Sequence, residues 1–201
     1  MKKILTLSAA AIAAAIALAG CSTGSGGSMP GMNMGGSGMS TDSAPAASDH
    51  NAADTMFTQG MIPHHTQAVE MSDLILKKQG IDPKVTTLAT RIKAAQAPEI
   101  EKMTGWLKQW NEPAQMAGGD MSGMTSGTMS SDDMTKLDAA QGTEAAKLYL
   151  TQMIAHHQGA VTMAKTEEST GKSADAVALS KSIATSQAAE IEEMKKLLAA
   201  L

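Results

Sequence analysis

The chain contains the stretch MIPHHTQAVEM at residues 61–71 and a second version of it, MIAHHQGAVTM, at residues 153–163. These two stretches align without a gap at an offset of 92 residues. A second pair of blocks, QAPEIEKM at 96–103 and QAAEIEEM at 187–194, aligns at an offset of 91. Two separate matches at nearly the same offset indicate an internal repeat, so each half of the chain is a copy of one unit.

Each copy contains the signals of two helices joined by a short turn. Asp82 is a good helix N-cap because Pro83 follows it at the first helical position, and Ser173 is a candidate cap in the second copy. Gly142 is a point at which a helix can break. The sequence predicts helices at residues 51–80, 82–111, 131–171 and 173–201.

The repeated motifs place apolar and histidine side chains on the same helix faces. At about 100° per residue, Met61, His64, His65, Ala68 and Met71 share one face, and so do the matching residues of the second copy. Neither hairpin can cover its own apolar stripe. We therefore expect an all-α protein, a four-helix bundle of two repeated antiparallel helix hairpins at residues 51–111 and 131–201 that form one domain.

The composition excludes several classes of protein. Among 201 residues there are 17 Met but only one Phe, one Tyr and two Trp, and strand-favouring residues are sparse, which argues against an all-β fold. The formal net charge of −4 provides no excess of basic residues for nucleic acid. A single Cys excludes an intrachain disulfide and a cysteine-based zinc or iron–sulfur site.

The N-terminus has the features of an export signal. Lys2 and Lys3 precede an apolar run at residues 4–19 that is too short to cross a bilayer comfortably. The run ends LAGC at residues 18–21, which resembles a bacterial lipobox. That resemblance implies a lipoprotein signal peptide at residues 1–20, acylation of Cys21, and an extracytoplasmic protein anchored by lipid to the cell membrane, in the periplasm or on the outer face.

Two segments rich in Gly, Ser and Met lie outside the predicted helices, a tether at residues 21–50 and a linker at residues 112–130. Such segments bury too little apolar surface to offset the entropy of ordering. Thioethers are soft ligands that select Cu(I) and, by extension, Ag(I). We expect labile soft-metal sites at Met29, Met32, Met34, Met39, Met116, Met121, Met124 and Met129. These methionines lie in segments with little core to fill, and Met134 lies beside the second segment. The alternative is compositional drift without a ligand role.

The His pairs are the candidate copper ligands of the helices. Burial of imidazole beside apolar groups is unfavourable unless it is paired or binds a metal. Met61 and Met153 lie three or four residues before the histidines, at a spacing that allows joint ligation. The primary set is His64, His65, His156, His157, Met61 and Met153, with Glu99, Glu190, Met103 and Met194 as supporting residues. The alternative is that these histidines are core groups bonded to carbonyls, Glu99 or Glu190.

The His-pair blocks and the Gln-x-x-Glu-Ile-x-x-Met blocks resemble the ferritin-like bacterial family named domain of unknown function 305. The resemblance covers residues 51–111 and 131–201 and implies a ferritin-like bundle, with copper binding in some members. The ligands that it implies here are His64, His65, Met61 and Met71 from the first motif, and His156, His157, Met153 and Met163 from the second.

These features predict a protein that sequesters or hands over copper and is not an enzyme. Cu(II) would bind at the His pairs and Cu(I) or Ag(I) at Met, and the protein partner would be an unidentified copper exporter or oxidase. One alternative is a metal-free interaction bundle on the cell surface. Another is a di-iron oxidoreductase, but no paired His has Glu or Asp three residues before it, as a Glu-x-x-His site requires.

The lipobox generates the first testable prediction. The mature protein should begin at Cys21 and sediment with membranes, whereas Cys21→Ser should leave the protein unprocessed or release it. Membrane fractionation combined with mass spectrometry of the N-terminal peptide measures both. A wild-type protein that is fully soluble and unacylated would contradict the prediction.

Overall fold

The computed structural model describes residues 49–115 and 126–201. Within these ranges the chain forms five helices and no strand, so the all-α prediction is confirmed. The helices are α1 (Ala52–Leu76), α2 (Pro83–Gln109), α3 (Ser131–Ala139), α4 (Gly142–Thr170) and α5 (Ala174–Ala200). None of them is long and apolar enough to span a bilayer. The predicted residues Cys21, Met29, Met32, Met34, Met39, Met116, Met121 and Met124 lie outside the described ranges.

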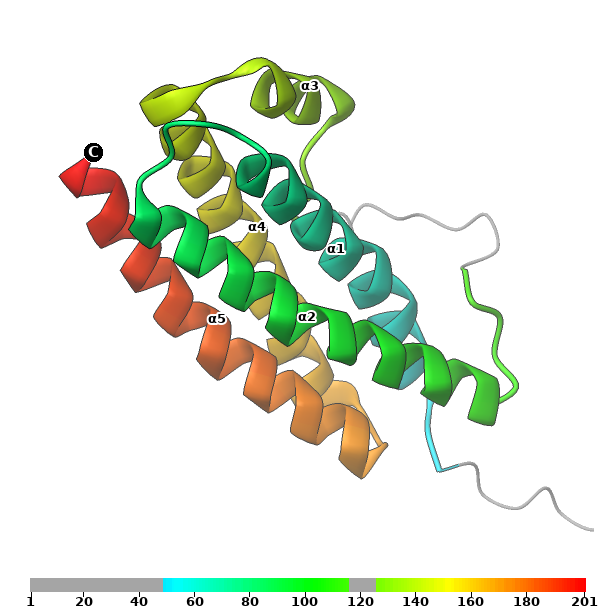
Figure 1. Ribbon diagram of the computed structural model, residues 1–201. Helices are drawn as coiled ribbons and strands as arrows, with labels where there is room; N and C mark the ends of the chain where they lie inside the picture. The colour runs from blue at the N-terminus through cyan, green and yellow to red at the C-terminus, as the bar shows by residue number, and fades with distance from the viewer. Residues whose placement is uncertain (1–48, 116–125) are drawn as a thin grey trace, which may run out of the picture. The chain divides into compact units, whose positions relative to one another are not determined.

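The four long helices form a bundle of two hairpins, as the repeat predicts. α1 packs along α2, α4 packs along α5, and the hairpins meet mainly through α1 and α4 (Figure 1). α3 lies at one end of the bundle and contacts α1 and α4 (Figure 1). Both hairpins belong to one compact unit.

The predicted helix starts at Asp82 and Ser173 are both confirmed. The Asp82 carboxylate accepts a hydrogen bond from the Lys84 amide at 2.7 Å, and the Ser173 hydroxyl accepts one from the Ala176 amide at 3.3 Å. The helix expected at residues 131–171 is interrupted near Gly142, the break point that the sequence offered, and forms two helices, α3 and α4. Gly142 has a φ of +55°, a conformation that cannot continue a right-handed helix, and it marks the break.

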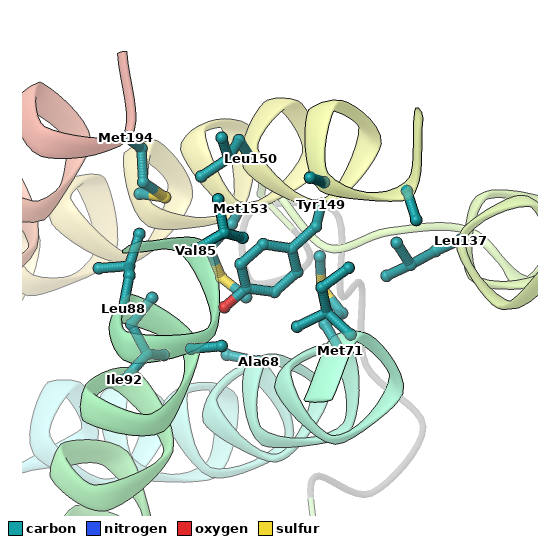
Figure 2. Packing of buried hydrophobic residues seen from close by; sticks show 14 of the residues in the cluster. Ala68, Met71, Val85, Leu88, Ile92, Leu137, Tyr149, Leu150, Met153 and Met194 are labelled. Atoms are coloured by element: carbon teal, nitrogen blue, oxygen red, sulfur yellow. The ribbon is translucent and has the colours of Figure 1, made fainter. Parts of the chain in front are cut away.

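The core of the bundle consists of two apolar clusters. Figure 2 shows the first cluster, in which the Tyr149 ring lies among side chains of α1, α2 and α4; its hydroxyl lies 3.1 Å from that of Ser72. The second cluster includes Phe57, Met61, Met103, Trp106 and Met163. Along α1 the second cluster comes before the His pair and the first cluster after it, and along α4 this order is reversed. The His pairs therefore lie at the level that separates the clusters.

A buried carboxyl pair ties the start of α1 to the turn between α4 and α5. Asp54 accepts backbone hydrogen bonds from Asn51 at 2.6 Å, Ser173 at 2.9 Å and Lys172 at 3.1 Å. Burial, with a further contribution from Asp54, raises the pKa of Glu167 to about 8. Burial also acts to raise the pKa of Asp54. The hydrogen bonds of Asp54 with Glu167 and with these amides outweigh burial, so the pKa of Asp54 is lowered. At neutral pH a protonated Glu167 therefore lies beside an ionised Asp54.

This pair predicts a specific pH dependence of stability. Glu167 keeps its proton up to about pH 8 when folded but only to about 4.5, its ordinary value, when unfolded. Its stabilising contribution is therefore complete below pH 4.5 and is lost as the pH rises toward 8, at no more than about 1.4 kcal/mol per pH unit for one proton. Glu167→Gln keeps a neutral polar group and should remove this dependence.

Denaturant unfolding of the metal-free protein between about pH 5 and pH 9 measures the effect. The matched control is Glu101→Gln, which removes an exposed carboxyl from α2 and should retain the wild-type dependence. Parallel stability curves for wild type and Glu167→Gln would contradict the assignment.

Candidate metal centre

Both His pairs lie in a buried polar layer between the two apolar clusters. His64 is 1% exposed and the other three histidines are fully buried. α2 and α5 complete the layer with Gln96, Glu99, Gln187 and Glu190, which are the repeated Gln-x-x-Glu blocks. The two glutamates are partly exposed, but apolar side chains shield the histidines on both sides, so the imidazole nitrogens depend on the layer's other polar groups, on the backbone or on a ligand for partners.

The second histidine of each pair bonds to a glutamate within its own hairpin. His65 Nε2–H donates to Glu99 Oε2 at 2.7 Å, and His157 Nε2–H donates to Glu190 Oε2 at 2.7 Å. A carboxylate only accepts, so Nε2 of each ring holds a proton, and in the neutral ring Nδ1 holds the lone pair. Both Nδ1 atoms are buried, and no described residue forms a hydrogen bond with them.

The first histidines of the pairs face each other across the junction of the hairpins. The ring centroids of His64 and His156 lie 3.7 Å apart, with an angle of 38° between the ring planes. His64 Nε2–H donates to the Ser126 carbonyl at 3.2 Å, which leaves its Nδ1 without a partner. Neither ring nitrogen of His156 has a partner in normal hydrogen-bond geometry, although the backbone of His64 lies close enough to favour the protonated ring. In total, five imidazole nitrogens of the layer are buried and have no hydrogen-bond partner within the part of the chain that the structure describes.

The environment keeps the facing rings neutral. Burial lowers the pKa of His64 to about 3, helped by His65 and His157 and opposed by the Ser126 carbonyl. Burial, together with the other three imidazoles, lowers the pKa of His156 well below 6.5. A neutral imidazole has a free lone pair, so both rings are in the protonation state that metal ligation requires.

Six buried methionines flank the layer, three in each cluster. Met61 and Met153 lie about one turn from the histidines on opposite sides of the layer, and Met103 and Met194 lie one turn beyond the two glutamates. Met71 and Met163 are seven residues beyond His64 and His156, about 10 Å along the helix axis. They are therefore the less direct candidates for an ion shared with these rings.

The structure corrects one expectation about the linker. The sequence placed Met129 and Met134 in a segment with little core to fill, but both are partly buried against the first apolar cluster. The reason is that residues 126–130 lie against the bundle and α3 folds back onto α1 and α4. The soft-metal role of Met129 stays a prediction, now for a packed side chain.

Sequence reasoning missed several members of the layer. Gln96 and Gln187 are 3% exposed, and the Oε1 atom of each has no partner. The signal for them was present, since each opens one of the repeated blocks. Ser126 had no such signal, because it comes from the linker and reaches His64 only through the fold.

The layer is not a preformed metal site. Among the described residues, no group of three or more His, Cys, Asp and Glu side chains is arranged to hold an ion. The rings of His64 and His156 are tilted against each other with their centroids only 3.7 Å apart, so they must separate before an ion can bind between them. The donor chemistry nevertheless fits copper and silver, because unpartnered imidazoles beside thioethers form a borderline-to-soft ligand set.

Comparison with known proteins agrees with this fold. The family model described as Domain of unknown function (DUF305) matches residues 54–198. A solved DUF305 protein from Streptomyces coelicolor, whose description proposes secretion, is 34% identical, with a TM-score of 0.70 over 76% of this chain and 93% of that one. CopM, solved in Cu(I)-bound and Cu(II)-bound forms, is 31–32% identical, with TM-scores of 0.60–0.61 over 72–73% of this chain and 94–95% of CopM.

A curated relative from Acanthamoeba polyphaga mimivirus, described as uncharacterized protein L153, is 39% identical over 56 residues. That match covers 28% of this chain and 36% of the viral protein, so this chain spans only about a third of that relative. The family model, in contrast, covers most of the chain from α1 to α5. The chain belongs to the DUF305 family.

Proposed function

We propose that this protein binds copper in its buried histidine layer and sequesters or hands over the metal outside the cytoplasm. The observation that supports this proposal most strongly is the set of five buried imidazole nitrogens that have no hydrogen-bond partner among residues 49–115 and 126–201. Unpartnered buried polar atoms are unfavourable, and a bound metal ion would satisfy them. Copper is the metal class that imidazole and thioether donors together favour.

The solved relatives support the same metal class. CopM has been solved in Cu(I)-bound, Cu(II)-bound and Ag-bound forms. This chain is about 31% identical to CopM and covers more than nine tenths of its length. Cu(I), Cu(II) and Ag(I) are therefore the ions that we propose for this chain.

Each oxidation state has its own donors in the layer. Cu(II) takes imidazole nitrogen, and Glu99 and Glu190 orient His65 and His157 with their Nδ1 lone pairs free. His64 and His156 supply nitrogens from the junction of the two hairpins. Cu(I) and Ag(I) take the thioethers of Met61 and Met153, together with imidazole.

Two features outside the layer support a location in the cell envelope. The N-terminal apolar run and the LAGC sequence at residues 18–21 favour export and acylation of Cys21. The description of the Streptomyces coelicolor relative as secreted agrees with export. The lipid would hold the bundle at a membrane, where a copper exporter or oxidase is a suitable exchange partner.

Binding without catalysis fits the layer better than di-iron chemistry. A di-iron carboxylate site takes Glu from all four helices of a bundle, two of them in Glu-x-x-His motifs. Here the layer contains two glutamates, and each bonds to a histidine of its own hairpin. A copper carrier needs only ligands that exchange, so we propose that the protein is not an enzyme.

The proposal predicts that the facing histidines dominate Cu(II) binding. His64→Gln together with His156→Gln should weaken Cu(II) affinity by roughly a hundredfold or more, because two nitrogen donors are lost. His50→Gln is the matched control, since His50 lies outside the layer, stacked on Trp110 at 4.5 Å and 3.3 Å from Glu112. Equilibrium dialysis against buffered Cu(II) measures both variants. Equal affinities in the double variant and the control would contradict the proposal.

The same titration can be followed as a function of pH. An exposed imidazole would lose copper as the pH falls through about 6.5. Because burial lowers the pKa of His64 to about 3 and that of His156 well below 6.5, we expect Cu(II) binding to persist to lower pH than this.

A second prediction concerns the methionine-rich segments. Deletion of residues 22–48 with Met116→Leu, Met121→Leu and Met124→Leu should lower the Cu(I) stoichiometry under reducing conditions, because neutral thioethers on a Gly-rich chain bind soft ions loosely. Cu(II) binding and helicity should stay unchanged. Met129 stays in place in this variant because it packs against the core.

Competition with a Cu(I) chelator measures the stoichiometry. Met56→Leu is the control, since it removes an exposed thioether from α1 and leaves both segments intact. If the segment variant binds as much Cu(I) as wild type, these segments are not metal sites.

A further inference from the structure

We infer that Gln67 is a positioning residue for the metal centre, because it holds the end of the linker across the junction of α1 and α4, where Ser126 bonds to His64. We call residues 126–130 the strap. This inference rests on the proposed function in so far as it assigns Gln67 a role in metal binding. The contacts that support it are present in the metal-free protein.

Gln67 holds the strap through two hydrogen bonds to one backbone unit. Its Nε2–H donates to the Met129 carbonyl at 2.9 Å, and its Oε1 accepts from the Met129 amide at 2.7 Å. Both partners on the strap are backbone atoms, so Gln67 is the side chain on which these two hydrogen bonds depend. A carboxamide is the side chain that supplies this donor and acceptor together.

The other side of the strap lies against the backbone of α4. A Cβ atom added to Gly159 would lie 1.8 Å from the Ser126 carbonyl oxygen. On the strap, Gly127 has a φ of +81°, and a Cβ there would lie 2.6 Å from the Ala155 carbonyl oxygen. The strap can take this path only because both residues are glycines.

The internal repeat connects these two contacts. At the offset of 92 residues, Gln67 aligns with Gly159. The two copies of the 11-residue motif differ at four positions, one of which is Gln67 and Gly159. At the three remaining positions the residue is exposed in both copies; these are Pro63 and Ala155, Thr66 and Gln158, and Glu70 and Thr162. The strap crosses equivalent surfaces of α1 and α4. In the first copy of the motif Gln67 forms hydrogen bonds to the strap, and in the second copy Gly159 leaves room for its backbone. The two copies therefore differ at this position because the strap needs a hydrogen-bonding side chain on α1 and the absence of a side chain on α4.

The strap determines which nitrogen of His64 is free. The Ser126 carbonyl can only accept, so His64 Nε2 holds the proton and Nδ1 holds the lone pair. Glu99 does the same for His65, and Glu190 does the same for His157. Partners of this kind fix the tautomer and orientation of a ligating imidazole. Gln67 thus acts on His64 through the strap.

The test compares two variants that displace the strap by independent means. Gln67→Ala removes the two hydrogen bonds to the Met129 backbone. Gly159→Ala places a Cβ atom where the strap backbone lies, and it does not weaken α4 because Ala has a higher helix propensity than Gly. Gln158→Ala, an exposed neighbour on α4, is the matched control. Circular dichroism verifies that all three variants keep the wild-type helicity.

The first readout is nitrogen-15 NMR of the histidine rings in the metal-free protein. We expect wild type and Gln158→Ala to show His64 as the single tautomer protonated at Nε2. Gln67→Ala and Gly159→Ala should show a mixture of both tautomers, with His65 and His157 unchanged. The Met129 amide should exchange with solvent about tenfold faster in Gln67→Ala, because it loses its acceptor. An unchanged His64 tautomer in both variants overturns the inference.

The second readout is Cu(II) affinity by equilibrium dialysis. Loss of a partner that orients a ligand typically weakens metal binding about 10-fold to 100-fold, and we expect this loss in both variants but not in the control. A changed tautomer with wild-type affinity overturns the role of Gln67 in metal binding. A wild-type protein that binds no copper contradicts the proposed function instead, and the NMR result still decides whether the strap positions His64.

Discussion

Four imidazoles buried between two apolar clusters are the constraint on which the rest of this structure depends. Such groups cannot reach water, so each needs a partner from a neighbouring element or from a ligand. Glu99 satisfies one nitrogen of His65, Glu190 one of His157, and the Ser126 carbonyl one of His64. These bonds link α1 to α2, α4 to α5 and the linker to α1. The nitrogens that have no partner among the described residues are the donors of the copper site that we propose.

The repeat explains why this layer is nearly symmetric and where the symmetry ends. Each hairpin contributes one His pair, one Gln and one Glu, and the two glutamate bonds have the same length of 2.7 Å. The linker exists once, so it can bond to only one of the two facing histidines. His64 therefore has an external partner and His156 has none in normal geometry. We expect His156 to be the ring that moves most easily when the two facing rings separate for an ion.

The sequence predicted those features that depend on local spacing or on the repeat. The bundle, the caps at Asp82 and Ser173 and the placement of the His pairs on the core face all follow from periodicity and short motifs. It did not predict the Ser126 bond to His64, the role of Gln67 or the packing of Met129. These contacts join α1 to a linker without periodicity, across about 60 residues of chain, and only the folded structure brings them together.

The most direct test of the account is a crystal structure of the copper-loaded protein with anomalous diffraction measured at the copper absorption edge. We predict a copper peak in the buried layer, with nitrogen ligands from His64 and His156 and with the centroids of these two rings farther apart than 3.7 Å. Copper found only outside the layer, with the rings of His64 and His156 still in contact, would contradict this prediction.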